Sequence, residues 1–270
     1  MKPSNSLFDL TGRVAMVTGG GGSLGSAICE GLAGAGAAVV VVDMAGASGD
    51  TVAARIRAGG GRADALAVDV SDEKNVADLF AKFDALHPAL DILVNGISAA
   101  IERFQPEDVT LASWRHMLDT NLTGYFLCMQ EAGRRMIARG QGGSIINIGS
   151  IGGMNALGRG AMAYGVAKAG VGQLTREAAV AWARHDIRVN ALLPCQFTNT
   201  WWEARLADPA CKASNEQVLR GIPMGRLGRP DEMIGPVLFL ASPASSMVTG
   251  ALIPVDGGNL AINAGGSVFW

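Results

Sequence analysis

Short apolar runs alternate with longer Ala/Leu-rich segments along the 270-residue chain. Most of the runs are continuous, as expected for central strands that are buried on both faces of a parallel sheet. They predict strands at Val14–Thr18, Ala38–Asp43, Ala63–Asp69, Ile92–Asn95, Ser144–Ile148, Arg188–Leu193 and Ala251–Val255. The longer segments predict helices that include Ser23–Ala35, Asp72–Leu86, Leu111–Arg139, Met162–His185 and Pro230–Ala241. Ser71 is expected to be the N-cap of the second of these helices.

The alternation of strands and helices continues from one end of the chain to the other. It predicts an α/β fold in which a Rossmann-type, doubly wound sheet of mostly seven parallel strands carries helices on both faces. Gly-rich pieces fall at strand–helix junctions, and no linker, repeat or break in composition interrupts the pattern. We therefore expect a single domain over residues 1–270.

Charge and cysteine content argue against several classes of function. The net charge is −2, with no basic run and no acidic tail, whereas nucleic acids and anionic membranes are bound by concentrated cationic faces. The four cysteines show no C-x-x-C spacing and only three histidines accompany them, so we expect free thiols in a reducing compartment and no metal site. Residues 1–10 lack the apolar stretch of a signal peptide, and no segment has the roughly 18 apolar residues of a membrane span. A cytoplasmic protein is expected.

A glycine-rich turn follows the first predicted strand. Residues 19–25, Gly-Gly-Gly-Gly-Ser-Leu-Gly, lead into a helix, where glycines allow a sharp turn and let backbone N–H groups approach a pyrophosphate. Asp43 ends the next strand, and a carboxylate there accepts hydrogen bonds from the adenosine ribose and repels a 2′-phosphate. No Lys or Arg occurs in the turn or between Asp43 and Asp50. The pattern favours NAD over NADP as cofactor; the alternative is a strand-end carboxylate that touches no ligand.

Tyr164 and Lys168 are four residues apart on a predicted helix and therefore share one face. A free phenol has a pKa of about 10 and is a poor base at neutral pH. A lysine ammonium one turn away and the positive ring of an oxidised nicotinamide would both favour the phenolate. Such a base can take the proton of an alcohol while a hydride leaves for the nicotinamide. Without further motifs, the same spacing would more often be a pair on a helix surface.

Further motifs accompany this pair along the chain. In order, the pieces are Thr18-Gly19…Gly25, Asp69-Val70, Asn95, Asn121 within Thr-Asn-Leu-Thr-Gly, Ser150, Tyr164…Lys168, Arg188-Val-Asn190-Ala with Pro194, Arg226-Leu-Gly-Arg-Pro230 and Val255-Asp-Gly-Gly258. With them the chain resembles the short-chain dehydrogenase/reductase family, classical type, over nearly its whole length. The opening Phe8-Asp-Leu-Thr-Gly-Arg-Val-Ala and residues 28–36 are also similar to the gluconate and sugar-alcohol branch of that family.

The resemblance implies a catalytic role for four residues. Tyr164 would be the general base and acid, and Ser150 would hold the substrate oxygen beside it. Lys168 would bind the nicotinamide ribose and lower the Tyr164 pKa. Asn121 would support a water through which protons reach solvent. Taken singly, Asn121 could cap a helix turn and Ser150 could be a loop hydroxyl.

The resemblance also implies a cofactor site, with a cofactor half up to about residue 150 and a catalytic half beyond it. Asp69 and Val70 would flank the adenine, although Asp69 could be an ordinary N-cap, and Asn95 would close the cleft over the ribose. The full set of expected cofactor residues is Gly19, Gly22, Ser23, Leu24, Gly25, Asp43, Asp69, Val70, Asn95, Gly96, Tyr164, Lys168, Pro194, Phe197 and Thr198.

Four positions depart from the family pattern around the cofactor. Ser23 replaces the middle glycine of the turn, and Asn95-Gly-Ile-Ser98 stands where the family has Asn-Asn-Ala-Gly. Cys195 follows the proline that ends the sixth strand, where the family has a glycine, and it reduces backbone freedom there. At the position of the family's next threonine, which contacts the nicotinamide carboxamide, this chain has Asn199, with a threonine on either side.

Family substrates lie between the loop after Ser150, the segment after the fourth strand and the stretch after Pro194. These supply the substrate candidates Ser98, Ser150, Ile151, Gly152, Met154, Asn155, Gln196, Trp201, Trp202 and Arg205. The two tryptophans can stack on a sugar ring or form an apolar lid, or they can pack against helices. We expect NAD-dependent oxidation of a secondary alcohol that is a polyol, sugar or sugar acid. The alternatives are a carbonyl or 3-oxoacyl reductase and a catalytically silent NAD-binding scaffold.

The charged fraction of 17% is low for a monomer and favours apolar surface covered by other subunits. Small residues are frequent in residues 161–172 and allow close approach of helices. The resemblance implies pairing of the helices Leu111–Arg139 and Met162–His185 in dimers, and a homotetramer completed through the last helix and strand. Residues 261–270 end in Val-Phe-Trp and could dock on a neighbouring subunit, cover a partner's active site or fray in solvent.

Overall fold

The computed structural model of the protein describes residues 7–44 and 46–262. Parallel strands form one sheet in the order β3-β2-β1-β4-β5-β6-β7. They are β1 (Val14–Thr18), β2 (Ala38–Asp43), β3 (Arg62–Ala67), β4 (Ile92–Asn95), β5 (Gly143–Ile148), β6 (Ile187–Pro194) and β7 (Leu252–Val255). The predicted seven-stranded parallel sheet is confirmed. Its strand order reverses between β1 and β4, which is where doubly wound folds bind their ligands.

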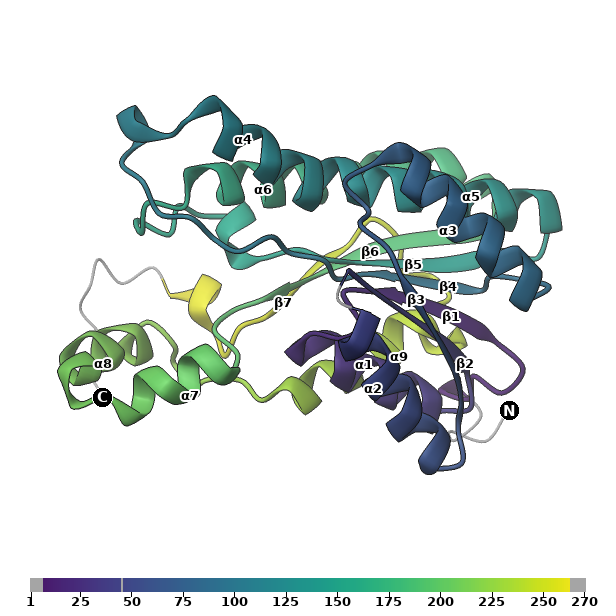
Figure 1. Cartoon of the computed structure of the whole chain (residues 1–270), viewed down its shortest axis with the longest axis horizontal. Coiled ribbons are helices and arrows are strands. Elements are labelled where there is room, and N and C mark those ends of the chain that lie inside the picture. The colour runs from purple at the N-terminus through teal and green to yellow at the C-terminus, as the bar shows by residue number, and fades with distance from the viewer. Residues whose placement is uncertain (1–6, 45, 263–270) are drawn as a thin grey trace.

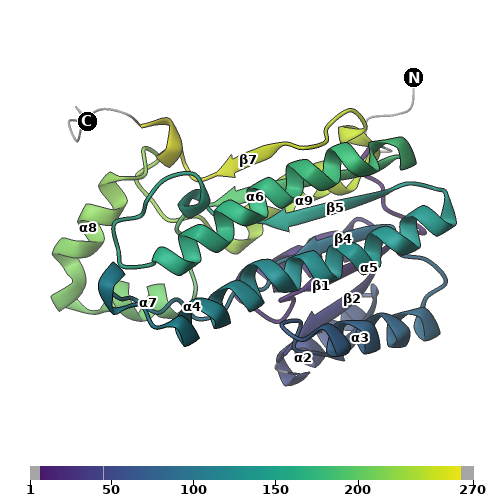
Figure 2. The same cartoon turned by 90° about the horizontal axis from the view of Figure 1, so that it is seen from above.

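Helices cover both faces of the sheet (Figure 1). They are α1 (Ser23–Gly34), α2 (Gly46–Ala58), α3 (Glu73–Leu86), α4 (Leu111–Leu118), α5 (Gly124–Arg139), α6 (Met162–Trp182), α7 (Thr200–Ala207), α8 (Lys212–Arg220) and α9 (Ile234–Ala241). The first two and the last lie on one face, and α3, α5 and α6 lie on the other. The pair α7 and α8 stands beyond the carboxyl ends of the strands in both views (Figure 2).

The valines of β2 pack alternately in the two hydrophobic cores, one on each face of the sheet. Successive side chains of a strand point to opposite faces. Val39 and Val41 accordingly pack in the cluster that contains Ile28 of α1, while the valines at 40 and 42 pack with Phe80 of α3. All four valines are completely buried. A continuous apolar run is therefore what this position in a covered parallel sheet requires.

The predicted helix Leu111–Arg139 is not continuous. A wider π-helical turn at Asp119–Thr123 separates α4 from α5, and the N–H of Gly124 bonds to the carbonyl of Asp119. Such a turn inserts one residue into a helix and often occurs at a functional site. It buries Asn121 completely. The prediction of one continuous helix was wrong at this turn. It arose because the apolar residues on either side retain helical spacing.

Two local corrections concern the segment after β3. The N-cap of α3 is Asp72 rather than Ser71, because the Asp72 carboxylate accepts a hydrogen bond from the N–H of Asn75 at 2.9 Å. Ser71 instead donates its N–H and hydroxyl to the Asp69 carboxylate, at 2.9 and 2.7 Å. This turn follows a strand that ends at Ala67, two residues before the predicted end.

The apolar pattern does not predict α2, α7 and α8, because each buries few large side chains. In α2 the buried residues are Gly49, Val52, Ala53 and Ile56, half of them very small. None of the helices in the described part of the chain is long and apolar enough to cross a membrane.

Candidate active site

The turn after β1 depends on its glycines. Gly19 has a φ of +72°, and a Cβ there would lie 2.7 Å from the carbonyl oxygen of Gly96. A Cβ on Gly25 would lie 2.0 Å from the carbonyl oxygen of Gly19. Side chains are therefore excluded from the inner side of the turn, at the N-terminus of α1. This cradle of exposed backbone fits the pyrophosphate of a dinucleotide.

Asp43 lies on the outer side of the same turn, where its Oδ2 accepts a hydrogen bond from the N–H of Gly21 at 3.0 Å. The hollow beside it is lined by Gly21, Gly22, Ser23, Ser26, Ala47, Ser48, Thr51, Val52 and Arg55. Sequence reasoning did not consider Arg55, whose guanidinium pairs with Glu30 at 2.8 Å. The one cationic residue in this described lining thus has an acidic partner of its own.

The residues after β3 and β4 that we expected at the cofactor site also stabilise the fold. The Asp69 carboxylate holds the turn at Ser71, and Val70 is buried in the core. Asn95 is also buried, and its amide donates to Asn147 Oδ1 at 3.0 Å. Its side chain therefore links β4 to β5, whereas we expected it to close the cleft over a ribose. The half-buried Gly96 follows it at the strand end.

Ser150 and Tyr164 bring two hydroxyl groups together at the carboxyl end of β5 and the first turn of α6. Burial raises the pKa of Tyr164, and the neighbouring Ser150 side chain partly offsets this rise. The Ser150 oxygen also accepts the N–H of Gly152 at 3.0 Å, which fixes its direction. The sequence-predicted serine and tyrosine therefore form one site.

Lys168 is buried beneath Tyr164, with its Nζ 5.9 Å from the centre of the tyrosine ring. The ammonium donates to the hydroxyl of Tyr125 at 2.8 Å and to the carbonyl of Ile148 at 3.0 Å. Burial lowers the pKa of Lys168 to about 7. In the structure burial raises the pKa of Tyr164, so its lowering by Lys168 stays a prediction.

Asn121 lies in the π-helical turn. Its Nδ2 donates to the carbonyl oxygen of Met117 at 3.2 Å, and its Oδ1 has no partner among the described residues. A buried amide oxygen without a protein partner is a usual site for a bound water. The position therefore fits the support of a water, as the family resemblance implies.

The loop after β6 is fixed on two sides. The N–H of Thr198 donates to the carbonyl of Gly228 at 2.8 Å, and the N–H of Gly228 donates to the carbonyl of Gln196 at 3.0 Å. On the other side, the Ser23 hydroxyl donates to the carbonyl of Thr198 at 3.2 Å. Ser23, which replaces a family glycine, thus joins the cofactor turn to this loop. Asn199 caps α7 by accepting the N–H of Trp202 at 2.9 Å.

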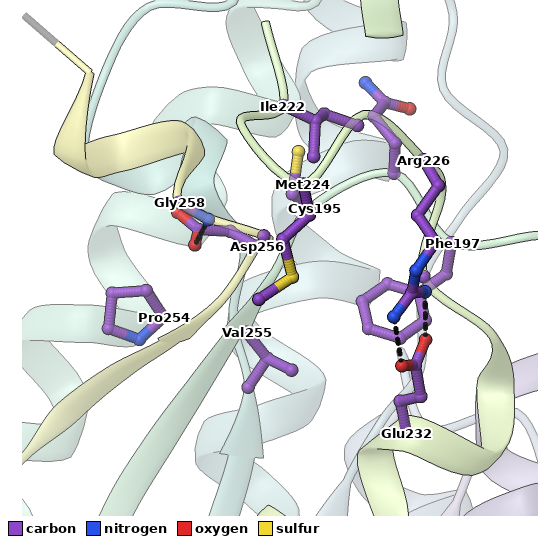
Figure 3. A pocket seen from close by; sticks show the side chains of 13 residues that line it. Cys195, Phe197, Ile222, Met224, Arg226, Glu232, Pro254, Val255, Asp256 and Gly258 are labelled. Carbon is purple, nitrogen blue, oxygen red and sulfur yellow. Dashed lines mark hydrogen bonds and ion pairs between the residues drawn. The ribbon is translucent and has the colours of Figure 1, made fainter.

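A cavity of about 370 Å³ is lined in part by the same loop, and Tyr164 is not among its lining residues (Figure 3). Cys195, Phe197, Ile222 and Met224 contribute to its wall. Its charged side chains include Arg226, which forms two hydrogen bonds to the Glu232 carboxylate at 2.7 and 2.8 Å. Cys195, Gln196 and Phe197 line both this cavity and the pocket that contains Ser150 and Tyr164, which we name the catalytic pocket.

The catalytic pocket has a volume of about 240 Å³. It is lined by Ser23, Leu24, Ile101, Arg103, Ser150, Ile151, Leu157, Arg159, Ala161, Tyr164, Pro194, Cys195, Gln196, Phe197, Thr198, Asn199 and Trp202. Ten of these seventeen are residues that the sequence assigned to the cofactor or substrate. Sequence reasoning missed the two arginines, which are the charged residues of this lining. Arg159 lies in a segment flanked by Ser150 and Tyr164, and that placement is a signal that could have identified it.

Several substrate candidates lie outside this lining. Trp201 is 53% exposed and packs edge-on against Trp202, with ring centres 5.0 Å apart. Arg205 lies over both rings and hydrogen-bonds to Ser214 at 2.5 Å. The remaining candidates outside the lining are Ser98, Gly152, Met154 and Asn155. Of the two tryptophans and Arg205, which we expected to face the substrate, only Trp202 is among the described residues that line this pocket.

The comparisons with known proteins cover nearly the whole chain. The family model for enoyl-(acyl carrier protein) reductase matches residues 19–259. The cis-4-hydroxycyclohexanecarboxylate dehydrogenase of Sinomonas cyclohexanicum is 41% identical over 252 residues, covering 93% of this chain and 97% of that protein. The galactitol 2-dehydrogenase of Rhizobium johnstonii is 39% identical over 256 residues, covering 93% and 96%. The crystal structure of a gluconate 5-dehydrogenase from Burkholderia cenocepacia, in complex with NADP and tartrate, matches with a TM-score of 0.89 at 35% identity, covering 96% of this chain and 100% of that one.

These similarities extend over the sheet, the glycine turn and the segment that carries Ser150 and Tyr164. The relatives named are dehydrogenases of compounds that contain a hydroxyl group. The chain therefore belongs to the short-chain dehydrogenase/reductase family, close to its gluconate and sugar-alcohol dehydrogenases, and is an oxidoreductase that acts on alcohols with a nicotinamide cofactor.

Proposed function

We propose that the protein is an NAD-dependent dehydrogenase that oxidises a secondary alcohol, with Tyr164 as the general base. The observation that carries this proposal is that Ser150 and Tyr164 line one pocket, with the buried Lys168 ammonium 5.9 Å from the centre of the Tyr164 ring. The glycine turn and Lys168 would hold the cofactor, which supplies the hydride acceptor when bound.

The other steps of the proposed reaction, substrate binding and proton transfer, are assigned to residues of the chain. The Ser150 hydroxyl, held by Gly152, donates to the substrate oxygen and keeps it within reach of Tyr164. Tyr164 takes the hydroxyl proton of the substrate and returns it in the reverse reaction. Lys168 places a positive charge below the phenol, and Asn121 lies where a water can connect this region with solvent. The loop beyond Pro194 limits access of water to the reacting atoms.

NAD is proposed as the cofactor on the basis of Asp43. A 2′-phosphate would meet its carboxylate, which the N–H of Gly21 holds in place, and Arg55 is already paired with Glu30. We expect kcat/KM with NAD to exceed that with NADP by about 100-fold, and Asp43→Ser to reduce this preference at least tenfold. Initial rates with both cofactors measure it. Equal rates, or a preference for the NADP found in the Burkholderia neighbour, would contradict this part of the proposal.

The two arginines of the catalytic pocket favour a substrate that carries a carboxylate. Arg159 is half-buried, Arg103 donates to its carbonyl at 3.2 Å, and no acidic side chain occurs among the described lining residues. A carboxylate would form charge-assisted hydrogen bonds with such guanidinium groups. Two of the relatives are named for acids of this kind, hydroxycyclohexanecarboxylate and gluconate. We therefore propose a sugar acid or a cyclic hydroxy acid in preference to a neutral polyol.

Arg159→Gln tests this choice of substrate. We expect its KM for gluconate or 4-hydroxycyclohexanecarboxylate to rise about 10- to 100-fold, because one charge-assisted hydrogen bond contributes roughly 1.5–3 kcal/mol. The KM for galactitol should stay within about twofold, because that substrate has no charge. Arg62→Gln on the exposed edge strand β3 is the matched control for loss of a positive charge. An equal rise of KM for galactitol and gluconate would show that Arg159 acts only on the shape of the pocket.

A reductase of acyl thioester substrates is the competing activity. It would prefer NADPH and a long apolar substrate, so the cofactor comparison and a panel of 3-oxoacyl compounds separate the two. A silent scaffold would bind NAD without turnover of any alcohol in the panel.

A further inference from the structure

Tyr125 is one of two tyrosines in the chain, and it lies in the first turn of α5. Its side chain is completely buried. Its hydroxyl oxygen lies 2.8 Å from the Nζ of Lys168, 2.9 Å from the carbonyl oxygen of Ile97 and 3.0 Å from that of Ile148. The family motifs quoted above do not include this position.

The donors and acceptors around Tyr125 can be assigned because a hydroxyl has one proton. The hydroxyl accepts a hydrogen bond from Lys168 and donates to one of the two carbonyl groups, at Ile97 or Ile148. The ammonium of Lys168 donates two of its protons to Tyr125 and Ile148. Its third N–H has no hydrogen-bond partner among the described contacts, and Nζ lies 5.9 Å from the centre of the Tyr164 ring. The contact with Tyr125 therefore determines the direction of the lysine head.

The Tyr125 ring adds a second interaction with the same ammonium. Nζ lies 4.5 Å from the ring centre, within the range of a cation–π contact. An ammonium buried in an apolar region loses its proton unless acceptors and nearby negative charge compensate for the lost water. Besides Lys168, the titratable groups that act on Tyr125 are Tyr164 of α6 and Cys128 of α5, and the carbonyl groups come from the loop after β4 and from the end of β5.

We propose that Tyr125 is a positioning residue for alcohol oxidation, whose hydroxyl fixes the Lys168 ammonium below Tyr164 and keeps it charged. This inference rests on the proposed function, because it assigns Tyr125 a part in the same proton transfer. Phenylalanine would fill nearly the same volume, so packing alone does not require the hydroxyl. The hydroxyl instead supplies the acceptor that a buried ammonium needs.

The test is the pH dependence of the Tyr125→Phe variant. Lys168 would lose an acceptor and become neutral at a lower pH, so the Tyr164 phenolate would be less stabilised. We expect kcat for alcohol oxidation at pH 7 to fall about 10- to 30-fold, and the acid limb of the kcat profile to move up by about one pH unit. The dissociation constant of NAD should change by less than about threefold, since the glycine turn is untouched.

Cys128→Ala is the matched control, because Cys128 is buried on the same helix and has no hydrogen bond to Lys168 among the described contacts. It should keep the wild-type pH profile even if the melting temperature falls. If Tyr125→Phe does not fold, Tyr125→Met gives the same readout, because methionine adapts to irregular buried space. A Tyr125 variant with the wild-type kcat and an unshifted acid limb would overturn the proposal.

A second measurement does not depend on turnover. In a double-mutant cycle of Tyr125→Phe and Lys168→Met, the changes in the free energy of unfolding at pH 6 should be non-additive. The non-additivity should be smaller at pH 9, where Lys168 is mostly neutral. Additive effects at both pH values would refute the Tyr125–Lys168 contact. If the cycle shows coupling but the wild type oxidises no alcohol, the proposed function fails while the contact stands.

Discussion

Tyr164→Phe is expected to lower kcat for alcohol oxidation about 1,000-fold, because the variant has no group that can take the hydroxyl proton. The change removes one oxygen from a half-buried ring and leaves the ring itself in place. The Ser150 hydroxyl stays held by Gly152, so the substrate oxygen can still be bound. Steady-state rates give the loss of turnover, and isothermal titration with NAD gives the retained affinity.

The pH dependence of the wild-type rate tests the same assignment. Burial raises the pKa of Tyr164, and only the phenolate accepts a proton. The rate of alcohol oxidation should therefore increase with pH, and the rate of carbonyl reduction, which needs the protonated phenol, should decrease. Tyr164→Phe should abolish both dependences along with the activity. Retention of more than a tenth of kcat, with correct folding, would remove Tyr164 from the role of base.

Lys168→Met is expected to lower kcat about 100-fold or more and, at the same time, to stabilise the protein. Lys168 is 3% exposed, and no carboxylate is among the partners of its ammonium. Replacing a buried charge by an apolar side chain of similar length can raise the free energy of unfolding by roughly 1–4 kcal/mol. An activity loss combined with a stability gain is typical of a residue retained for catalysis.

The stability gain should depend on pH in a defined direction. Lys168 has an ordinary pKa of 10.5 when the chain is unfolded, and burial lowers its pKa to about 7 in the folded protein. Between these values the unfolded chain binds the extra proton, so the stability of the wild type decreases as the pH falls from 10.5 to about 7. Below pH 7 this loss is complete. The advantage of Lys168→Met is thus largest below pH 7 and disappears toward pH 10.5.

Urea denaturation at pH 6, 8 and 9.5 measures this difference, with Lys82→Met on the exposed side of α3 as the control. The control should show no pH-dependent gain. A Lys168→Met protein that is less stable than the wild type at pH 6 would mean that the hydrogen bonds to Tyr125 and Ile148 outweigh the burial of the charge.

The sheet could be predicted from the sequence because its strands are nearly all apolar. A run such as residues 38–42 is buried on both sides, so its pattern depends on little besides the sheet itself. The elements at the edge of the site were harder to predict. α7 buries only Trp202, and its position depends on capping by Asn199 and on packing with α8. These contacts involve few large apolar side chains and leave little periodicity in the sequence.

Some residues of the site could likewise be predicted from the sequence, and others could not. Ser150 and Tyr164 could be predicted because they lie at the end of a strand and the start of a helix, whose relative positions the fold determines. Arg103 could not, since it lies in a loop whose path is set by local contacts such as its bond to the carbonyl of residue 159. For Arg159 the one available signal was its position between Ser150 and Tyr164 in the sequence. Tyr125 lies in the middle of an apolar helix pattern, where a tyrosine resembles an ordinary core residue.

The π-helical turn at Asp119–Thr123 determines which face of the following helix meets Lys168. Each residue of an α-helix advances the chain by about 100° around the axis, so one inserted residue rotates everything after it by that angle. Leu111–Leu118 and Gly124–Arg139 are consequently out of phase, and a helical wheel drawn through both would misplace every side chain of the second. If the same residues were wound as a regular α-helix without the wider turn, the Tyr125 hydroxyl would point about a quarter of a revolution away from the lysine that it now contacts.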